Sequence, residues 1–486
     1  MTAAGGVRQA LIIGAGFGGI GMAIRLKRAG IDDFIILERA DGVGGVWHAN
    51  RYPGAACDVE SHLYSYSFET NFDWERPHGT RSEILRYFDH CLRKYAIVPH
   101  IRFNTPVDSA TFDEDQGVWT VHTKTGEALR ARALVSAIGL FNTPAIPKLA
   151  GIDEFKGQAF HSAAWSEDFD PSGRRIAVIG TGCSAAQFVP EIVDRATQLT
   201  VFQRTPAFVG PKAEAAFTPA QRRIYRLLPI LRRFDRLSIF RRYEQLYRIH
   251  EDPAFRTARG EDARAFVATQ VSNPVKRQQL TPTYDAGCKR GVRSGSFLKA
   301  LDRDHVGVVT APIARVHANA IETADGVLHP VDTIIYGTGF TPSNYLSTFR
   351  LQGLGGMTLS DAWEEGPEAY LGMTVSGFPN FFMIYGPNTN APASIIYIIE
   401  CQIDYILKCV QALARGQLRQ MNVSAETQAT FNADLQKQLR STAWASGCMS
   451  YFMTAAGKIV TQWPGASRSY WLRTRHLNMK DYQTTH

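Results

Sequence analysis

The sequence predicts an α/β protein with two Rossmann-like domains and an inserted helical subdomain. Three observations lead to this fold class. Two glycine-rich turns, at residues 14–19 and 180–185, each follow a short apolar run and precede apolar residues at helical spacing. Strand–turn–helix units of this kind build doubly wound parallel sheets, whose ligands bind at the carboxyl ends of the strands. A third stretch, residues 221–248, carries nine arginines among apolar residues at helical spacing, which predicts additional helices.

The first glycine turn predicts a dinucleotide site. It reads Gly-Ala-Gly-Phe-Gly-Gly after the apolar run 10–13, and the next apolar run, 34–37, ends at Glu38. Glycines allow a tight turn and close approach of the backbone to a pyrophosphate, and the helix N-terminus favours that anion. An acidic residue at the position of Glu38 accepts hydrogen bonds from a ribose 2′-OH. The residues predicted to contact this dinucleotide are Gly14, Gly16, Phe17, Gly18, Gly19 and Glu38.

The second glycine turn predicts a dinucleotide of a different kind. Ala185 replaces its third glycine, which the fingerprint allows, and the next apolar run, 199–202, leads into Gln203, Arg204 and Thr205. An arginine at this position suits a 2′-phosphate. The two turns together are typical of flavin enzymes reduced by NADPH, with FAD in the first domain and NADPH in the second. The residues predicted to contact NADPH here are Gly180, Thr181, Gly182, Ser184, Ala185, Arg204 and Thr205.

Apolar runs and proline-containing segments place the domain boundaries. The run 134–139 reads as the strand that closes the first unit, and a proline-punctuated crossover follows at 142–147. The run 333–340 is its counterpart in the second unit. After it we expect the chain to return to the first domain through a strand within 378–387 and a helix over 394–414. The predicted ranges are 1–147 and 341–486 for the FAD-binding domain, 148–210 and 288–340 for the NADP-binding domain, and 211–287 for the helical insertion.

Composition limits the class of protein. With 486 residues, 45% of them hydrophobic and 20% charged, the chain reads as an ordinary soluble globular protein of two or three domains. The first predicted strand begins within about ten residues of Met1, so we expect no signal peptide. Polar residues such as Glu400 and Asp404 interrupt the apolar stretch 394–414, so we expect no membrane span. We predict a cytoplasmic location.

The cysteines predict unpaired thiols in a reducing compartment. No two of the seven form a CxxC or CxxxxC pair, so we expect neither a metal site nor a redox-active dithiol, and a flavin-disulfide reductase is excluded. Cys57, although adjacent to Asp58, is interpreted as a packed thiol because no basic residue lies near it in sequence. The seven residues are Cys57, Cys91, Cys183, Cys288, Cys401, Cys409 and Cys448.

The net charge of +8 is concentrated in the arginine-rich stretch 221–248. A patch of this kind could bind nucleic acid or a membrane surface. We favour the simpler interpretation, an inserted helical subdomain with a solvated basic face and an apolar face toward the core. The sequence therefore predicts no nucleic-acid partner and leaves weak membrane association open.

Two motifs between the glycine turns carry a family resemblance. Residues 44–58 contain Gly-x-Trp at 45–47 and Tyr-Pro-Gly at 52–54 and close with Asp58; residues 155–166 read F-x-G-x-x-x-H-x-x-x-W-S. In these motifs the chain resembles the Baeyer–Villiger monooxygenase family of class B flavoprotein monooxygenases, whose second motif ends in Trp followed by Pro or Asp. Related N- and S-oxygenating flavin monooxygenases carry Tyr or Phe and then Lys or Arg there. Trp165 therefore favours the Baeyer–Villiger branch, and Ser166 departs from its pattern.

The resemblance covers essentially the whole chain. Residues 287–290, 337–340 and 462–465 look like the family's Lys-Arg pair, its ATGF-like strand end and its terminal Trp-Pro-Gly. Residues 388–394 differ from the Leu-Gly-His-like stretch that relatives carry before a serine, in a loop that borders flavin and substrate in the family. The resemblance does not predict one particular substrate.

The resemblance implies an NADPH- and O₂-dependent FAD monooxygenase that oxidises ketones to esters or lactones through a C4a-peroxyflavin. It implies that Arg290 stabilises the peroxide and the Criegee intermediate, and that Asp58 pairs with Arg290 and positions it. Lys289 and Arg204 bind the 2′-phosphate of NADPH in this interpretation, and Trp47, Tyr52 and Pro53 pack around the isoalloxazine ring. His161 and Trp165, in the inter-domain link, are interpreted as structural. The further cofactor-binding residues that it implies are Gly45, Trp47, Tyr52, Asp58, Lys289 and Gly339.

Two other functions stay open at this point. The first is a flavin monooxygenase that forms N- or S-oxides from amines or thioethers. The second is an uncoupled NADPH oxidase or redox-sensing flavoprotein, which releases peroxide whatever substrate is offered. The expected partners are a small ketone, amine or sulfide and dioxygen.

Overall fold

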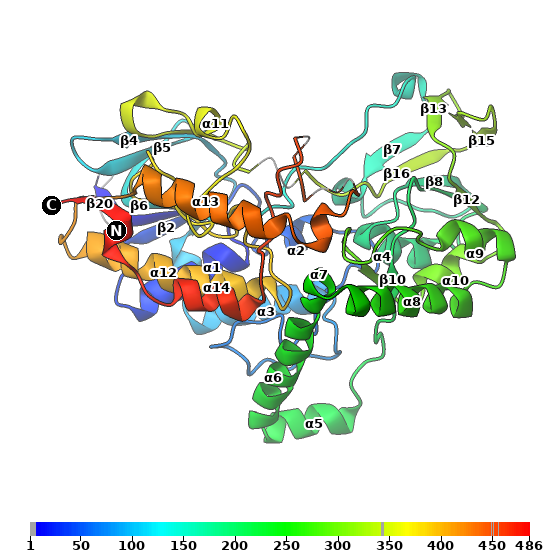
Figure 1. The fold of residues 1–486 in the computed structure, drawn as a ribbon, viewed down its shortest axis with the longest axis horizontal. Coiled ribbons are helices and arrows are strands. Elements are labelled where there is room, and N and C mark those ends of the chain that lie inside the picture. The colour runs from blue at the N-terminus through cyan, green and yellow to red at the C-terminus, as the bar shows by residue number, and fades with distance from the viewer. Residues whose placement is uncertain (1–5, 342–344, 449, 451, 455) are drawn as a thin grey trace.

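The protein folds into two α/β domains that lie side by side, with helices α5 and α6 projecting from one edge (Figure 1). The computed structural model describes residues 6–341, 345–448, 450, 452–454 and 456–486. Both predicted Rossmann-like domains and the helical insertion are present. The domain boundaries drawn from the sequence stay a prediction.

The first domain is built on an eight-stranded sheet. Its order is β17-β4-β5-β6-β1-β2-β3, and β18 also pairs with β6. The pairs β1–β2 and β1–β6 are parallel, with Ala10 opposite Phe34 and Ala133. The last two strands come from beyond Phe340, and they pair with β4 and β6 of this sheet. The strands are β1 (Val7–Ile13), β2 (Phe34–Leu37), β3 (Ile101–Arg102), β4 (Val107–Asp113), β5 (Val118–Thr123), β6 (Ala128–Ser136), β17 (Arg350–Gln352) and β18 (Phe381–Met383).

Helices cover this sheet and hold its core. The helix predicted over 394–414 is α12 (Ile395–Ala414), which packs against α1 (Phe17–Arg28) and α14 (Ser467–Thr474). The apolar face of α12 is buried. This agrees with the amphipathic character that the polar residues Glu400 and Asp404 give to the stretch. The remaining helices here are α2 (Val46–Ala49), α3 (Arg81–Lys94), α11 (Leu359–Ala362) and α13 (Ala425–Leu439). Strands β19 (Gln420–Val423) and β20 (Tyr482–Thr485) form a separate antiparallel pair.

The second domain has a five-stranded parallel sheet in the order β12-β9-β8-β16-β7. Helix α4 (Cys183–Ile192) follows β8 directly, and α10 (Phe297–Leu301) packs against α4. The strands are β7 (Gln158–His161), β8 (Arg175–Ile179), β9 (Gln198–Phe202), β12 (Val306–Val309) and β16 (Thr333–Tyr336). A small antiparallel sheet comprises β13 (Ile313–Val316), β14 (Ala320–Thr323) and β15 (Leu328–Pro330).

The arginine-rich stretch forms helices, as predicted, inside the second domain. They lie between two short paired strands, β10 (Val209–Gly210) and β11 (Val292–Arg293). Local sequence fixes where several of them begin, because Thr218, Asp252 and Asn273 cap helices whose next residue is proline. The helices are α5 (Pro219–Leu227), α6 (Ile230–Gln245), α7 (Arg248–Glu251), α8 (Pro253–Gln270) and α9 (Pro274–Leu280).

Two antiparallel connectors join the domains. Pro144 forms a β-bridge with Phe340, and the Ala145 amide donates to the Gly339 carbonyl at 2.8 Å. The Thr338 hydroxyl donates back to the Ala145 carbonyl at 2.5 Å. Single-turn 3₁₀ helices occur at Val98–His100, Ile152–Glu154, Ser162–Ala164, Leu354–Gly356, Ala443–Ala445 and Met479–Asp481.

One prediction about the cysteines is wrong. Cys288 and Cys448 form a disulfide with their Cα atoms 6.2 Å apart, whereas the other five cysteines are free thiols. The two residues are 160 positions apart, so no spacing motif in the sequence announces the pair. The fold brings them together, because Gly287, next to Cys288, lies against Ala443: a Cβ on Gly287 would be 3.4 Å from the Cβ of Ala443. Across the described part of the chain, no helix is long and apolar enough to span a membrane.

Candidate active site

The turn between β1 and α1 forms an anion cradle. Gly14 has a φ of +103°, and a Cβ there would lie 2.7 Å from the Ala137 carbonyl oxygen. A Cβ on Gly19 would lie 1.9 Å from the Gly14 oxygen, so both positions need glycine. Helix α1 begins after Gly16 without a side-chain cap. The N–H groups of its first turn are therefore suited to a phosphate.

Glu38 lies beside this cradle and is almost fully buried. One carboxylate oxygen accepts from the Ala15 amide at 2.7 Å, and the other from the Ala40 amide at 2.9 Å. A carboxylate has about four acceptor sites, so capacity remains for ribose hydroxyls. The buried carboxylate is thus held in place by backbone groups on both sides of the strand end.

The loop at residues 44–58 folds back onto the same turn. The Gly44 amide donates to the Ala15 carbonyl at 2.9 Å, and a Cβ on Gly45 would lie 3.2 Å from the Gly16 Cα. Trp47 follows on α2, and its indole N–H donates to the Tyr64 hydroxyl at 3.1 Å. This loop connects the glycine turn to the contact between the two domains.

The turn between β8 and α4 repeats the first cradle. Gly180 has a φ of +105°, and a Cβ there would lie 2.6 Å from the Gly337 oxygen. Helix α4 begins after Gly182, again without a side-chain cap. Ala185 is fully buried, and its Cβ would lie 3.1 Å from a Cβ on Gly337, so a small residue is needed at this third position. Thr181 is buried in the same turn, and Ser184 is half-buried on the first turn of α4.

Two cations lie together at the edge of the second cradle. Arg204 is exposed, two residues beyond the end of β9, and half-buried Thr205 follows it. Burial lowers the pKa of Lys289, and the positive charge of Arg204 lowers it further. The Lys289 ammonium also lies 5.2 Å from the centre of the Tyr284 ring. Two like charges held near each other favour a bound dianion such as a 2′-phosphate.

The structure brings Asp58 and Arg290 together where the domains meet. The guanidinium lies 3.6 Å from the Asp58 Oδ2, and the Lys212 ammonium lies 3.4 Å from the Oδ1. The Lys212 side chain is 6% exposed and that of Arg290 is 47% exposed. The Asp58 carboxylate therefore faces two positively charged side chains, the buried Lys212 and the more exposed Arg290.

Sequence reasoning missed Lys212 and Gln187. Gln187 lies on α4 of the second domain, yet its amide donates to the Ala56 carbonyl at 2.8 Å and to Asp58 at 3.4 Å. Gln187 lies on the side of α4 opposite its buried apolar residues, and no motif in the sequence marks it. Lys212 follows a proline in a loop, and no local pattern distinguishes it.

Helix α6 also reaches the Asp58 loop. The Tyr243 hydroxyl donates to the Asp58 carbonyl at 3.2 Å, and Arg293 donates to that hydroxyl at 2.6 Å. The helical insertion thus helps to support the residue that pairs with Arg290. Neither Tyr243 nor Arg293 is marked by a motif in the sequence.

Tyr52 lies in the core of the second domain. Its ring centre is 6.1 Å from that of Phe188 on α4, and its hydroxyl donates to Gln187 at 3.0 Å. Burial raises the pKa of Tyr52 to about 12. This placement makes Tyr52 a link between the Asp58 loop and α4, and its contact with the isoalloxazine ring stays a prediction.

His161 and Gly339 meet at the connectors. The His161 Nε2 donates to the Gly339 carbonyl at 2.9 Å, while Nδ1 accepts from the Ala163 amide at 3.1 Å. Burial lowers the pKa of His161, so the neutral imidazole is favoured. Trp165 packs on Phe188, with ring centres 5.2 Å apart. Both residues support the link between the domains.

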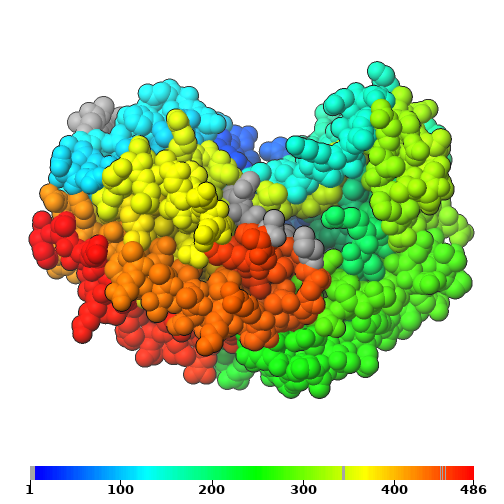
Figure 2. All heavy atoms as spheres, turned by 45° about the horizontal axis from the view of Figure 1, so that its top comes forward, coloured from blue at the N-terminus to red at the C-terminus, as the bar shows by residue number. Residues whose placement is uncertain are grey.

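The surface is hollowed between the two domains. Figure 2 shows this notch, with N-terminal residues (blue) at its floor. The described residues contain no cluster of three or more His, Cys, Asp or Glu side chains that could hold a metal ion.

Known proteins resemble the chain over its whole length. A family model described as pyridine nucleotide-disulphide oxidoreductase matches residues 11–217, which include both glycine turns. A Baeyer–Villiger monooxygenase of Pseudomonas aeruginosa is 39% identical over 98% of this chain and 91% of its own length. The chain belongs to the Baeyer–Villiger monooxygenase family.

Two further comparisons bear on this family assignment. The crystal structure of cyclohexanone monooxygenase from Rhodococcus sp. Phi1 bound to NADP⁺ superimposes with a TM-score of 0.90, at 28% identity over 99% of both chains. The phenazine N-monooxygenase of Lysobacter antibioticus is 33% identical over 82% of this chain and 81% of its own length. Relatives of this chain therefore include a protein named for nitrogen oxidation.

Proposed function

We propose that the chain is an NADPH- and O₂-dependent FAD monooxygenase of the Baeyer–Villiger type, which converts ketones to esters or lactones. The observation that carries this proposal is the contact between Arg290 and Asp58, whose charged groups lie 3.6 Å apart. An arginine stays protonated at every working pH and supplies rigid N–H donors for an anionic oxygen.

The residues of the first cradle fit FAD. Glycine is required at positions 14 and 19, the uncapped start of α1 suits the pyrophosphate, and Glu38 keeps acceptor capacity for the ribose. The second cradle fits NADPH, because Arg204 and Lys289 lie together beside the uncapped start of α4. FAD, once reduced by NADPH, supplies the reaction with O₂ from which one oxygen atom passes to the substrate.

Arg290 holds anionic oxygens during this transfer. Its guanidinium N–H groups would donate to negative charge that develops on the reacting oxygens. Asp58 keeps the guanidinium in place, while the buried ammonium of Lys212 shares the carboxylate and so limits how tightly Asp58 binds Arg290. A guanidinium that is too tightly paired would have little charge left for the substrate.

The Arg290→Ala enzyme tests this role. We expect flavin reduction by NADPH under anaerobic conditions to stay within about threefold of the native rate, and ester formation to fall by about 100-fold or more. The NADPH consumed in air would then appear as hydrogen peroxide. Slow flavin reduction together with normal ester yield per NADPH would overturn the role. Arg93→Ala, at an exposed arginine on α3, is the matched control and should change neither rate.

N-oxygenation is a second candidate, favoured by the similarity to a phenazine N-monooxygenase. A panel of ketones, tertiary amines, aromatic N-heterocycles and thioethers, analysed for products by mass spectrometry, separates the two. Esters or lactones support the main proposal, whereas N-oxides alone support the second. Peroxide in equal amount to NADPH with every compound indicates the oxidase that the sequence left open.

We also propose that the enzyme works in the cytoplasm, on a small molecule and without a nucleic-acid partner. The requirement for NADPH supports this location, because reducing compartments supply the reduced cofactor. Fractionation of cells followed by immunodetection tests it.

A further inference from the structure

The tip of the helical insertion exposes an unusual amount of apolar surface. We call residues 219–237, which comprise α5 and the first half of α6, the arginine tip. The two helices run below the body of the protein and away from the notch between the domains (Figure 1). Six large apolar side chains here are 43–66% exposed: Ile224, Leu227, Leu228, Ile230, Phe234 and Leu237. Scattered apolar residues are ordinary on a surface, but six within one helical pair mark an interaction site.

The same tip is strongly basic. Residues 219–234 contain five arginines and no acidic residue. Arg223 and Arg233 are exposed, and within the described residues no acidic side chain lies within ion-pair distance of either. Arg226 is 68% exposed even though it contacts Asp73. The exposed apolar side chains are thus interleaved with arginines that point to solvent.

The tip is firmly attached on its inner side. The Asp235 carboxylate lies 2.5 Å from the His62 ring nitrogen, and Arg236 donates to the carbonyls of His62, Leu63 and Ser65. Asp73 accepts from Arg222 at 2.8 Å and from Arg226 at 3.0 Å. The outward face is therefore presented by a fixed support and is not a frayed end.

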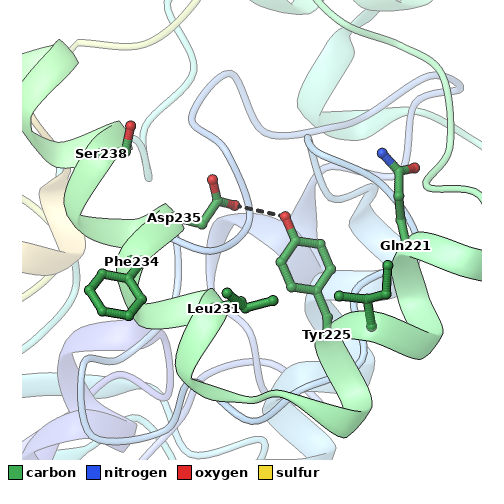
Figure 3. A pocket seen from close by; sticks show the side chains of 7 residues that line it. Gln221, Tyr225, Leu231, Phe234, Asp235 and Ser238 are labelled. Carbon is green, nitrogen blue, oxygen red and sulfur yellow. Dashed lines mark hydrogen bonds between the residues drawn. The ribbon is translucent and has the colours of Figure 1, made fainter.

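An open hollow lies between α5 and α6. Its volume is about 420 Å³, and Ile224, Leu231 and Phe234 form its apolar side. Figure 3 shows Phe234, Leu231 and Tyr225 around it, with the Tyr225 hydroxyl donating to Asp235 at 3.3 Å. None of the residues that line the hollow belongs to either dinucleotide cradle, and the hollow adds to the apolar surface of the tip.

We propose that the arginine tip docks on an anionic lipid surface. Leu227, Leu228 and Ile230 enter the boundary between headgroups and acyl chains, and the arginines bind lipid phosphates. Charge complementarity selects this partner over a second copy of the chain, because two tips facing each other would bring five arginines of each copy together. Nucleic acid would use the arginines but would leave the leucines without a role.

Binding to lipid vesicles tests the proposal with the full-length enzyme. The native enzyme should co-sediment with vesicles of mixed phosphatidylcholine and phosphatidylglycerol at low salt. It should bind at least about fivefold less to phosphatidylcholine alone, and salt should weaken the binding to the anionic vesicles. Absence of binding to the anionic vesicles at low salt would overturn the proposal.

Two pairs of variants separate the apolar from the charged contribution. Leu227→Ser/Leu228→Ser should lower the bound fraction about fivefold or more, and Arg223→Gln/Arg233→Gln should abolish the preference for anionic vesicles. The matched controls are Val327→Ser/Leu328→Ser, whose side chains are 48% and 58% exposed in the second domain, and Arg93→Gln/Arg440→Gln. Both controls should bind like the native enzyme.

The same variants distinguish the other partners. If the native enzyme instead fails to bind vesicles and forms concentration-dependent dimers that the leucine variant abolishes, the partner of the tip is a second copy of the chain and not a lipid surface. Binding to DNA that depends on the arginines and not on the leucines would replace it by nucleic acid. Because all these residues are exposed and distant from the site, melting temperature and NADPH oxidation should match those of the native enzyme. Equal loss of vesicle binding in control and tip variants would contradict the proposal.

Discussion

The carboxylate of Asp58 lies 3.6 Å from the guanidinium of Arg290, and these two residues come from the two different domains. The same carboxylate lies 3.4 Å from the ammonium of Lys212, which is almost fully buried. Asp58 is therefore both the residue that positions Arg290 and the counter-charge of a buried lysine. Its replacement has consequences for oxygen transfer and for stability.

Asp58→Asn should separate these consequences. The amide keeps the shape of the side chain and loses the negative charge, so Arg290 is no longer held and Lys212 is left as a buried unpaired charge. We expect ester yield per NADPH to fall about tenfold and the free energy of unfolding to fall by about 3 kcal/mol. Product analysis and urea unfolding measure the two effects.

Asp58→Asn/Lys212→Met is the control for that variant. Removing the buried ammonium as well should restore most of the free energy of unfolding. The ester yield per NADPH should stay as low as in Asp58→Asn. A native ester yield per NADPH in the double variant would show that Asp58 does not position Arg290.

Arg204→Gln and Lys289→Gln should each weaken the binding of NADPH. A charge-assisted hydrogen bond contributes about 1.5–3 kcal/mol, so the KM for NADPH should rise roughly 10- to 100-fold. The KM for NADH, which has no 2′-phosphate, should change little. Steady-state kinetics with both coenzymes measure the difference, and an equal rise for both would exclude a specific contact with the 2′-phosphate.

Gly19→Ala should impair FAD binding. The new methyl group would lie 1.9 Å from the Gly14 oxygen, so either the helix or the turn must move. Gly210→Ala is the control, because a Cβ there meets no atom within 4 Å. We expect the alanine variant at position 19 to purify with little flavin, as its absorbance spectrum would show, and the control to purify fully loaded.

The sequence predicted the parts of the site that are formed by residues close together in the chain. The two glycine turns and Glu38 could be read from the sequence because the strand, the turn and the helix that form each cradle are neighbours in the chain. Lys212 and Gln187 could not, since both reach Asp58 only after the second domain packs against the first. The placement of Tyr52 in the second domain's core and the pairing of Cys288 with Cys448 depend on the same long-range packing.

His250 should make the protein less stable in acid. Burial lowers its pKa to about 3, with a smaller contribution from Arg256, and its ring centre lies 3.7 Å from that of Trp444. In the unfolded chain the pKa is near 6.5, so below that pH the unfolded state binds the additional proton. The stability that His250 contributes is complete above pH 6.5, and it falls by up to about 1.4 kcal/mol per pH unit down to the folded pKa.

His250→Phe keeps an aromatic ring against Trp444 and cannot take up a proton. The free energy of unfolding, measured by urea titration between pH 4 and 8, should therefore depend less on pH in this variant. Burial also lowers the pKa of His161, so part of the dependence will remain. His122→Gln, at an exposed histidine, should leave the native pH profile unchanged. An unaltered profile in His250→Phe would assign the acid sensitivity to other groups.

The disulfide between Cys288 and Cys448 should stabilise the segment that carries Lys289 and Arg290. It closes a loop of 160 residues, and Cys288 directly precedes the two cations. We expect reduction by dithiothreitol to lower the free energy of unfolding by about 2–4 kcal/mol and to lower ester yield per NADPH, because Arg290 is then less firmly held. Cys288→Ser/Cys448→Ser should behave like the reduced enzyme and should not respond to dithiothreitol.

Thiol labelling of the denatured protein should find five free cysteines before reduction and seven after it. Seven before reduction would mean that the two thiols stay unpaired in the purified protein, and the effect of dithiothreitol should then vanish.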